Sequence, residues 1–184
     1  KAREQLLLTN EELSYLESVI TSVDNSEKMA DLAEIRSELE SAGYVKAHFN
    51  RKNKGTKNTP SRQIMKIEKD GYEIMIGKNN LQNDYLTLKI AKLTDTWLHV
   101  KDIPGSHVII RPPKPGQTIP KSVLDLAANF AAYFSKGRNS SLVAVDYTLR
   151  KYVRKPNGAK PGMVIYDNQK TIYITPDEEI IKQY

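Results

Sequence analysis

The segment over residues 50–62 most restricts how this chain can fold, because it contains no large apolar side chain. A stretch of this composition cannot contribute to a core, so it is predicted to be a linker. Apolar residues recur at helical spacing before it and alternate at strand spacing after it. The sequence therefore predicts a helical hairpin over residues 1–48, a basic linker over 49–62 and a second domain over 63–184.

The linker carries five cations, and it is either a mobile tether or a basic arm that orders on a phosphate backbone, two roles that are compatible. These cations are Arg51, Lys52, Lys54, Lys57 and Arg62.

Two apolar stripes predict the helical hairpin. The first stripe consists of Leu6, Leu13, Leu16, Ile20 and Val23, and the second of Met29, Leu32, Ile35 and Leu39. Thr9 and Glu12 fit a capping box, and Gly43 suits the position after the second helix. We expect the end of an antiparallel coiled coil; the alternative is that both helices simply pack on the second domain.

The second domain is predicted to be α+β, with a mostly antiparallel sheet and two helices. Asp70-Gly71 predicts a hairpin turn between strands over 64–69 and 72–76. Asn83-Asp84 can cap a helix bearing Leu86, Ile90 and Leu93, and a second helix is expected from about Pro120 to a stop at Gly137. The remaining strands are expected over 97–101, 106–111, 142–149, 163–166 and 171–174.

The charge of the chain is divided between its two ends. Residues 1–48 carry five Lys and Arg against ten Asp and Glu, whereas residues 49–184 carry twenty-three against twelve. This asymmetry indicates a polyanionic partner for the second domain, or else only a contribution to solubility.

Several classes of protein are excluded or disfavoured by composition. There is no cysteine, which excludes disulfides and thiolate chemistry. No apolar run approaches the roughly 18–20 residues that cross a bilayer. The first residues have the pattern of a helix interior and no signal peptide, so we expect a piece of a longer, cytoplasmic protein.

Enzymatic chemistry has weak candidates. His99 and His107 could bind a metal together only if the intervening hairpin loop has three or five residues, because a loop of two or four places them on opposite faces. The spacing of the carboxylates does not indicate that they converge in space, as acid catalysis or two-metal chemistry requires. The carboxylates considered are Asp84, Asp95, Asp102 and Asp146. We therefore predict a non-enzymatic protein without a metal or cofactor.

Binding of RNA has stronger support, from the segment over residues 150–162. Its cations can neutralise phosphates, and its aromatic ring can stack on an unpaired base. The alternative is a solvated loop that maintains solubility. The candidate residues here are Arg150, Lys151, Tyr152, Arg154, Lys155 and Lys160, to which Lys78 is added.

Three blocks of the second domain, residues 71–87, 95–110 and 155–164, resemble the signatures of the NFACT-R domain, and the helical hairpin resembles the end of the coiled coil of that family. The resemblance is to bacterial members, with Gram-positive cocci as the expected source. The matching motif positions are Gly77, Lys78, Asn79, Asp84, Trp97, His99, Ser106, His107, Lys155 and Lys160.

The resemblance implies an RNA-binding module of a factor for ribosome-associated quality control. Such proteins bind large ribosomal subunits and tRNA and support alanine tailing of stalled nascent chains. The family's N-terminal domain is not part of this sequence, so tailing does not transfer to it. Streptococcal members are also described as fibronectin-binding surface proteins without a signal peptide, which implies host fibronectin as an alternative partner and the cell surface as a second location. The oligomeric state is left open.

Overall fold

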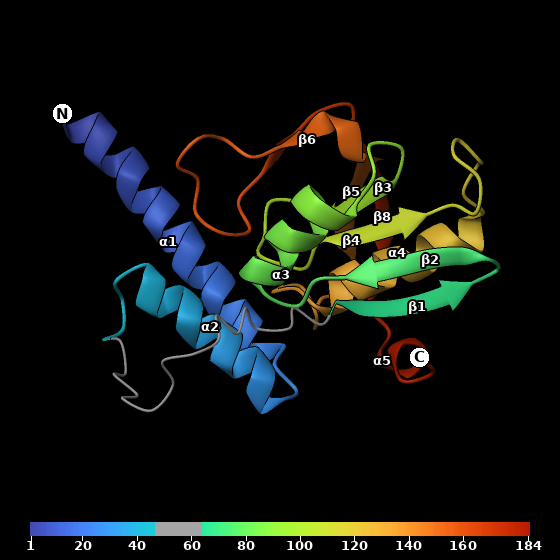
Figure 1. Ribbon diagram of the computed structural model, residues 1–184, viewed down its shortest axis with the longest axis horizontal. Helices are drawn as coiled ribbons and strands as arrows, with labels where there is room; N and C mark the ends of the chain where they lie inside the picture. Colours follow the sequence, from blue (N-terminus) through green and yellow to red (C-terminus); the bar gives the residue numbers. More distant parts are fainter. Residues whose placement is uncertain (47–63) are drawn as a thin grey trace, which may run out of the picture.

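A computed structural model of the protein describes residues 1–46 and 64–184 (Figure 1). The helices are α1 (Ala2–Asp24), α2 (Met29–Ser41), α3 (Asn80–Tyr85), the π-helix η1 (Leu86–Ile90), α4 (Lys121–Tyr133), the 3₁₀ helix η2 (Arg150–Tyr152) and α5 (Glu178–Ile181). The strands are β1 (Met65–Lys69), β2 (Tyr72–Ile76), β3 (Thr96–Val100), β4 (Val108–Arg111), β5 (Val143–Leu149), β6 (Val153–Arg154), β7 (Ile165–Tyr166) and β8 (Lys170–Ile174). The predicted α+β fold, a helical pair followed by a mostly antiparallel sheet, is confirmed.

The main sheet has six antiparallel strands in the order β1-β2-β4-β3-β5-β8, and β6 pairs with β7 in a separate ribbon. The predicted turn at Asp70-Gly71 joins β1 to β2. Both residues have positive φ angles, 53° and 79°, as a two-residue type I′ turn requires.

Each face of the sheet has its own apolar cluster. Helix α4 packs against one face, where Phe130 lies in a core with residues of β2, β3 and β4. On the other face Trp97 and Ile109 pack with Leu86 of η1 and Val153 of β6. Figure 1 shows α3 and α4 on opposite sides of the sheet.

The helices α1 and α2 form the predicted hairpin, but the predicted apolar face of α1 is wrong. Leu6, Leu13, Ile20 and Val23 are 60%, 57%, 61% and 44% exposed. The buried face is instead centred on Tyr15. Polar and aromatic residues line this face because it meets polar side chains of the second domain, so the spacing of leucines did not reveal it.

On α2, Ile35 is buried as the predicted stripe requires, whereas Met29 is 80% exposed. The predicted capping box is also wrong, because Thr9 lies inside α1 and its hydroxyl donates to the Gln5 carbonyl at 2.9 Å. Gly43 does follow α2, with a φ angle of 82° and its N–H bonded to the Glu40 carbonyl at 3.2 Å.

The helical pair also packs on the second domain, through a buried group of carboxylates and amides. The Glu34 carboxylate accepts hydrogen bonds from the side chains of Asn79 and Gln82, each at 2.8 Å. The Glu38 carboxylate accepts from Asn80 at 3.0 Å and from the Tyr15 hydroxyl at 2.8 Å. Burial beside Glu38 raises the pKa of the Tyr15 hydroxyl, which keeps it a donor.

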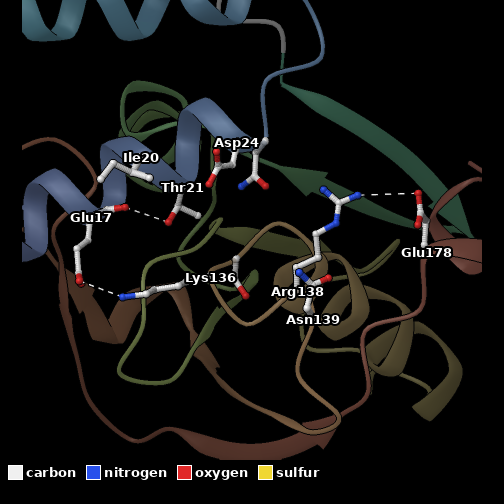
Figure 2. Close-up of a pocket in the computed structure, with 10 residues that line it drawn as sticks. Glu17, Ile20, Thr21, Asp24, Lys136, Arg138, Asn139 and Glu178 are labelled. Atoms are coloured by element: carbon white, nitrogen blue, oxygen red, sulfur yellow. Dashed lines mark hydrogen bonds and ion pairs between the residues drawn. The ribbon is translucent and has the colours of Figure 1, made fainter.

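Ion pairs surround this buried contact. Glu27 pairs with Lys78 at 2.9 Å, Glu17 with Lys136 at 3.0 Å and Glu12 with Lys160 at 3.1 Å. Figure 2 shows one part of the boundary, a cavity of about 680 Å³ between α1 and the turn after α4. There Lys136 reaches Glu17, and Arg138 reaches Glu178 at 4.0 Å. Acidic side chains of the helical pair therefore meet basic side chains of the second domain.

Two predicted helix boundaries are corrected. Helix α3 begins at Asn80 and is capped by Asn79, whose Oδ1 accepts from the Gln82 N–H at 2.9 Å, so Asn83 and Asp84 are not its cap. Their side chains bind residues distant in sequence instead. Helix α4 ends at Tyr133, before the predicted stop at Gly137.

Within residues 1–46 and 64–184, no helix combines the length and the apolar character needed to span a bilayer.

Candidate nucleic-acid interface

The register of β3 and β4 brings the two motif histidines together. Leu98 pairs with Val108, so His99 lies opposite His107 on the same face of the sheet, with ring centroids 5.3 Å apart. Trp97 lies on this face and contacts both imidazoles, with centroids 5.7 Å and 5.2 Å away. Of the two alternatives that the sequence left open, the structure has the one in which both histidines point to the same side.

Both imidazoles are held neutral at physiological pH. Burial lowers the pKa of His99 to about 4 and that of His107 well below its usual value. Thr87 Oγ1 lies 2.8 Å from His107 Nδ1, which orients the ring. In the part of the chain that the structure describes, no group of three or more His, Cys, Asp or Glu residues is arranged to hold a metal ion.

The side chain of Asn83 connects α3 to the turn that precedes β4. Its Oδ1 accepts the N–H of His107 at 2.9 Å, and its Nδ2 donates to the carbonyl of Gly105 at 3.2 Å. Gly77 permits this approach, because a Cβ there would lie 2.6 Å from Asn83 Oδ1. Ser106 is buried beside this turn, and its hydroxyl has no partner among the described residues.

The Asp84 carboxylate fixes the loop between β6 and β7. It accepts from the Gly162 N–H at 3.0 Å and pairs with Lys155. Lys155 also donates to the carbonyl of Lys160 at 3.0 Å. Figure 1 shows this loop running beside α1. These motif residues therefore hold the loop between β6 and β7 against α3.

Four of the predicted RNA-binding cations are engaged inside the protein. Lys155 pairs with Asp84, Lys160 with Glu12 and Lys78 with Glu27. Arg150 donates to the carbonyls of Thr87 and Val153, the latter at 2.8 Å.

Lys151 and Arg154 are exposed, and Tyr152 is half-buried between them. Lys151 lies over the Tyr152 ring at 4.9 Å, and Arg154 shares an exposed ion pair with Asp167 at 3.0 Å. The cations Arg51, Lys52, Lys54, Lys57 and Arg62 lie outside the described residues.

The fold adds two cations that the sequence reasoning did not single out, Lys89 and Lys92. The N–H of Lys151 bonds to the carbonyl of Leu93 at 3.2 Å, so η2 lies against the segment that follows η1. Lys89 and Lys92 are exposed and make no ion pair among the described residues. We call Lys89, Lys92, Lys151 and Arg154 the cationic edge. A search of the sequence for isolated lysines near helix ends would have found Lys89 and Lys92, but it would not have shown that η2 lies nearby.

The architecture and this surface define the class: an α+β domain with an attached helical pair and an exposed basic edge. Residues 62–168 match the family described as "NFACT protein RNA binding domain". Residues 1–58 match the family described as "NFACT N-terminal and middle domains". The chain belongs to the NFACT family, and its second domain is the RNA-binding domain of that family.

Similar proteins support this assignment. The chain is 43% identical over 180 residues to the Rqc2 homolog RqcH of Bacillus subtilis, a match that covers 97% of this chain and 30% of the relative. It is 44% identical over 176 residues to the Rqc2 homolog RqcH of Streptococcus suis, covering 95% and 30%. The chain thus spans less than a third of the length of these curated relatives.

A solved structure has the same fold. It is the C-terminal part of the fibronectin/fibrinogen-binding protein from Streptococcus suis, which matches with a TM-score of 0.84 and 43% sequence identity. The match covers 98% of this chain and 71% of that one.

Proposed function

We propose that this chain is a non-enzymatic RNA-binding part of a factor for ribosome-associated quality control, with the large ribosomal subunit and tRNA as its partners. The observation that carries the proposal is the cationic edge on a domain of the NFACT RNA-binding family. The names of the RqcH relatives support the cellular role. In this role the protein acts in the cytoplasm and supports alanine tailing that other parts of the full-length protein perform.

The cationic edge suits a phosphate backbone for a physical reason. Exposed lysines keep their charge available and release counterions when phosphates replace them. Tyr152 lies between Lys151 and Arg154, where its ring can stack on an unpaired base. The engaged cations Arg150 and Lys155 instead hold η2 and the loop after β6 in place.

The test compares two triple charge-reversal variants by titration with purified large subunits, tRNA and single-stranded RNA across a salt series. We expect Lys89→Glu/Lys92→Glu/Lys151→Glu to weaken RNA binding strongly. The slope of its plot of log affinity against log salt should become less negative by about 2, since each lost phosphate contact to single-stranded RNA contributes roughly 0.7 to that slope.

The matched control is Lys69→Glu/Lys121→Glu/Lys182→Glu, which has the same net charge and leaves Lys136 paired with Glu17. Lys121 and Lys182 lie on or beside the α4 side of the sheet, away from the cationic edge. Equal weakening by both variants would mean that net charge, and not this edge, governs binding. Replacing the five linker cations by Gln measures the contribution of residues 49–62 separately.

Fibronectin binding is a second candidate function, favoured by the name of the structurally similar Streptococcus suis protein. Basic surfaces associate with acidic protein segments by charge complementarity. The same variants titrated with fibronectin test it. Saturable binding of fibronectin without any binding of ribosomal subunits would replace the first proposal.

A further inference from the structure

A cavity of about 380 Å³ opens between α1, the turn over residues 102–105 and the segment over residues 162–166. Its volume lies within the roughly 300–1,000 Å³ of small-molecule sites. Trp97, His99, His107 and Tyr166 contribute to its wall, with Asp102 beside them. Three elements far apart in sequence thus enclose one aromatic, hydrogen-bonding space.

The strongest sign of a ligand is the indole of Trp97. Its side chain is fully buried, and its Nε1 has no hydrogen-bond partner among the described residues. An unpaired buried donor costs about 1–3 kcal/mol, so native structures rarely keep one without a reason. A ligand with an acceptor group in this cavity would satisfy it.

The other polar groups restrict the chemistry of that ligand. Both imidazoles already have partners within the protein: His107 Nδ1 lies 2.8 Å from Thr87 Oγ1, and backbone groups of Gly105 and Val100 bind His99. The polar groups of a ligand must therefore be met by Trp97 and Asp102. Asp102 makes no ion pair or hydrogen bond with any residue of 1–46 and 64–184, so its carboxylate can accept from a ligand. Among the residues that the structure describes, no Lys or Arg lines the cavity. A phosphate therefore finds no counter-charge here, whereas a neutral, planar group with donors and acceptors fits.

One residue of the cavity wall belongs to the same strand pair as a residue of the cationic edge. Tyr166 of its wall pairs with Val153 in the β6–β7 ribbon, and Arg154 of the cationic edge is the next residue. Lys101, which is exposed, precedes Asp102 at the opposite rim. The β6–β7 ribbon thus links the cavity wall to the cationic edge.

We propose that this cavity binds one unpaired nucleobase of the RNA, with guanine preferred. The N1–H and 2-amino groups of guanine provide two adjacent donors for the Asp102 carboxylate, and its acceptors suit the Trp97 indole. The inference deepens the proposed function by naming the part of the RNA that the second domain reads.

The chain contains a single tryptophan, so Trp97 fluorescence reports on this cavity alone. The first experiment titrates the protein with guanosine and uridine, followed by an RNA oligonucleotide carrying either one unpaired guanine or an abasic site at that position. We expect a saturable fluorescence change with guanosine at about 1 mM, a weaker one with uridine, and loss of the change with the abasic RNA.

Two variants block the site in different ways. Ser14→Phe fills the mouth from α1, and Leu13→Phe, on the exposed side of the same turn, is its control. Asp102→Asn keeps a residue type that tolerates the φ angle of 57° and should weaken guanosine binding about tenfold. Thermal unfolding of each variant verifies that it is folded.

The outcomes separate this inference from RNA binding itself. If RNA binds with the expected sensitivity to the cationic edge while Trp97 fluorescence and guanosine binding are absent, the base pocket is wrong and the proposed function stands. If guanosine binds the wild-type protein and Ser14→Phe equally, the cavity is not the site. Guanosine binding that Ser14→Phe abolishes, in a protein that fails to bind RNA, supports the pocket and overturns the RNA role.

Discussion

At the scale of single residues, the motif positions act mainly by holding backbone segments together. Asn83 binds the backbone of Gly105 and His107, and Asp84 binds the backbone of Gly162. These contacts position the histidine pair and the loop after β6. The short polar side chains of Asn83 and Asp84 therefore fix the turn before β4 and the loop after β6 through hydrogen bonds to their backbone.

Gly77→Ala tests this arrangement. The new Cβ would lie 2.6 Å from Asn83 Oδ1 and 2.9 Å from the Asn83 backbone nitrogen, so the segment must shift. We expect a loss of about 1–3 kcal/mol of unfolding free energy, measured in urea. Gly116→Ala is the comparison. A Cβ at Gly116 would meet no atom within 4 Å, so the only expected cost is the backbone strain of an alanine at a φ angle of 79°. An equal or smaller loss at Gly77 would show that the approach of Asn83 is unimportant.

At the scale of elements, the helical pair is attached by buried polar groups in addition to apolar packing. Glu38 is only 2% exposed and joins α1 and α2 to α3. The pKa of the Glu38 carboxyl is raised above its ordinary value, and the largest cause of this shift is burial. Hydrogen bonds from Asn80 and Tyr15 oppose the shift.

The sign of the resulting pH dependence follows from linkage. Because the folded protein retains the Glu38 proton to a higher pH than the unfolded chain does, Glu38 lowers stability as pH rises through its ordinary value of 4.5 and beyond. Glu38→Gln keeps an acceptor oxygen without this titration. We expect its melting temperature to exceed that of the wild type at pH 7 and to approach it at pH 4. A melting temperature that is lower at pH 7 would show that the charged hydrogen bonds outweigh the cost of burial.

At the scale of the whole molecule, the charge division of the sequence is partly neutralised within the fold. The acidic helical pair faces the basic domain, and ion pairs join Glu12, Glu17 and Glu27 to its lysines. The lysines of these pairs are therefore less available to an external polyanion than the lysines of the cationic edge.

Because of these ion pairs, we expect the free energy of unfolding to depend on the salt concentration. Exposed pairs contribute up to about 1 kcal/mol each and are screened by salt. We expect the wild type to lose about 1–2 kcal/mol of unfolding free energy when salt rises from roughly 0.05 to 1 M. The variant Glu12→Gln/Glu17→Gln/Glu27→Gln should start lower and change less. If both proteins respond alike, these pairs do not contribute to stability.

The exposed leucines of α1 show where prediction from sequence failed. Helical periodicity correctly predicted a helix, because apolar spacing and backbone propensity are local properties. It did not identify the buried face, since the buried Tyr15 and the half-buried Ser18 make hydrogen bonds to Glu38 and Asn80, and such polar contacts follow no apolar stripe. Likewise, Asn83 and Asp84 resemble a helix cap in sequence, whereas in the structure their side chains form hydrogen bonds with distant backbone groups.

The sequence by itself determined the α+β class, the turn at Asp70-Gly71 and the basic character of the second domain, because alternation, turn chemistry and charge depend on neighbouring residues. Only the tertiary structure decided that His99 faces His107, that Lys155 and Lys160 are engaged within the protein, and that η2 lies against the segment after η1. These relations depend on loop length and on the docking of separate elements. Because they combine residues as far apart as Glu12 and Lys160, no local pattern encodes them.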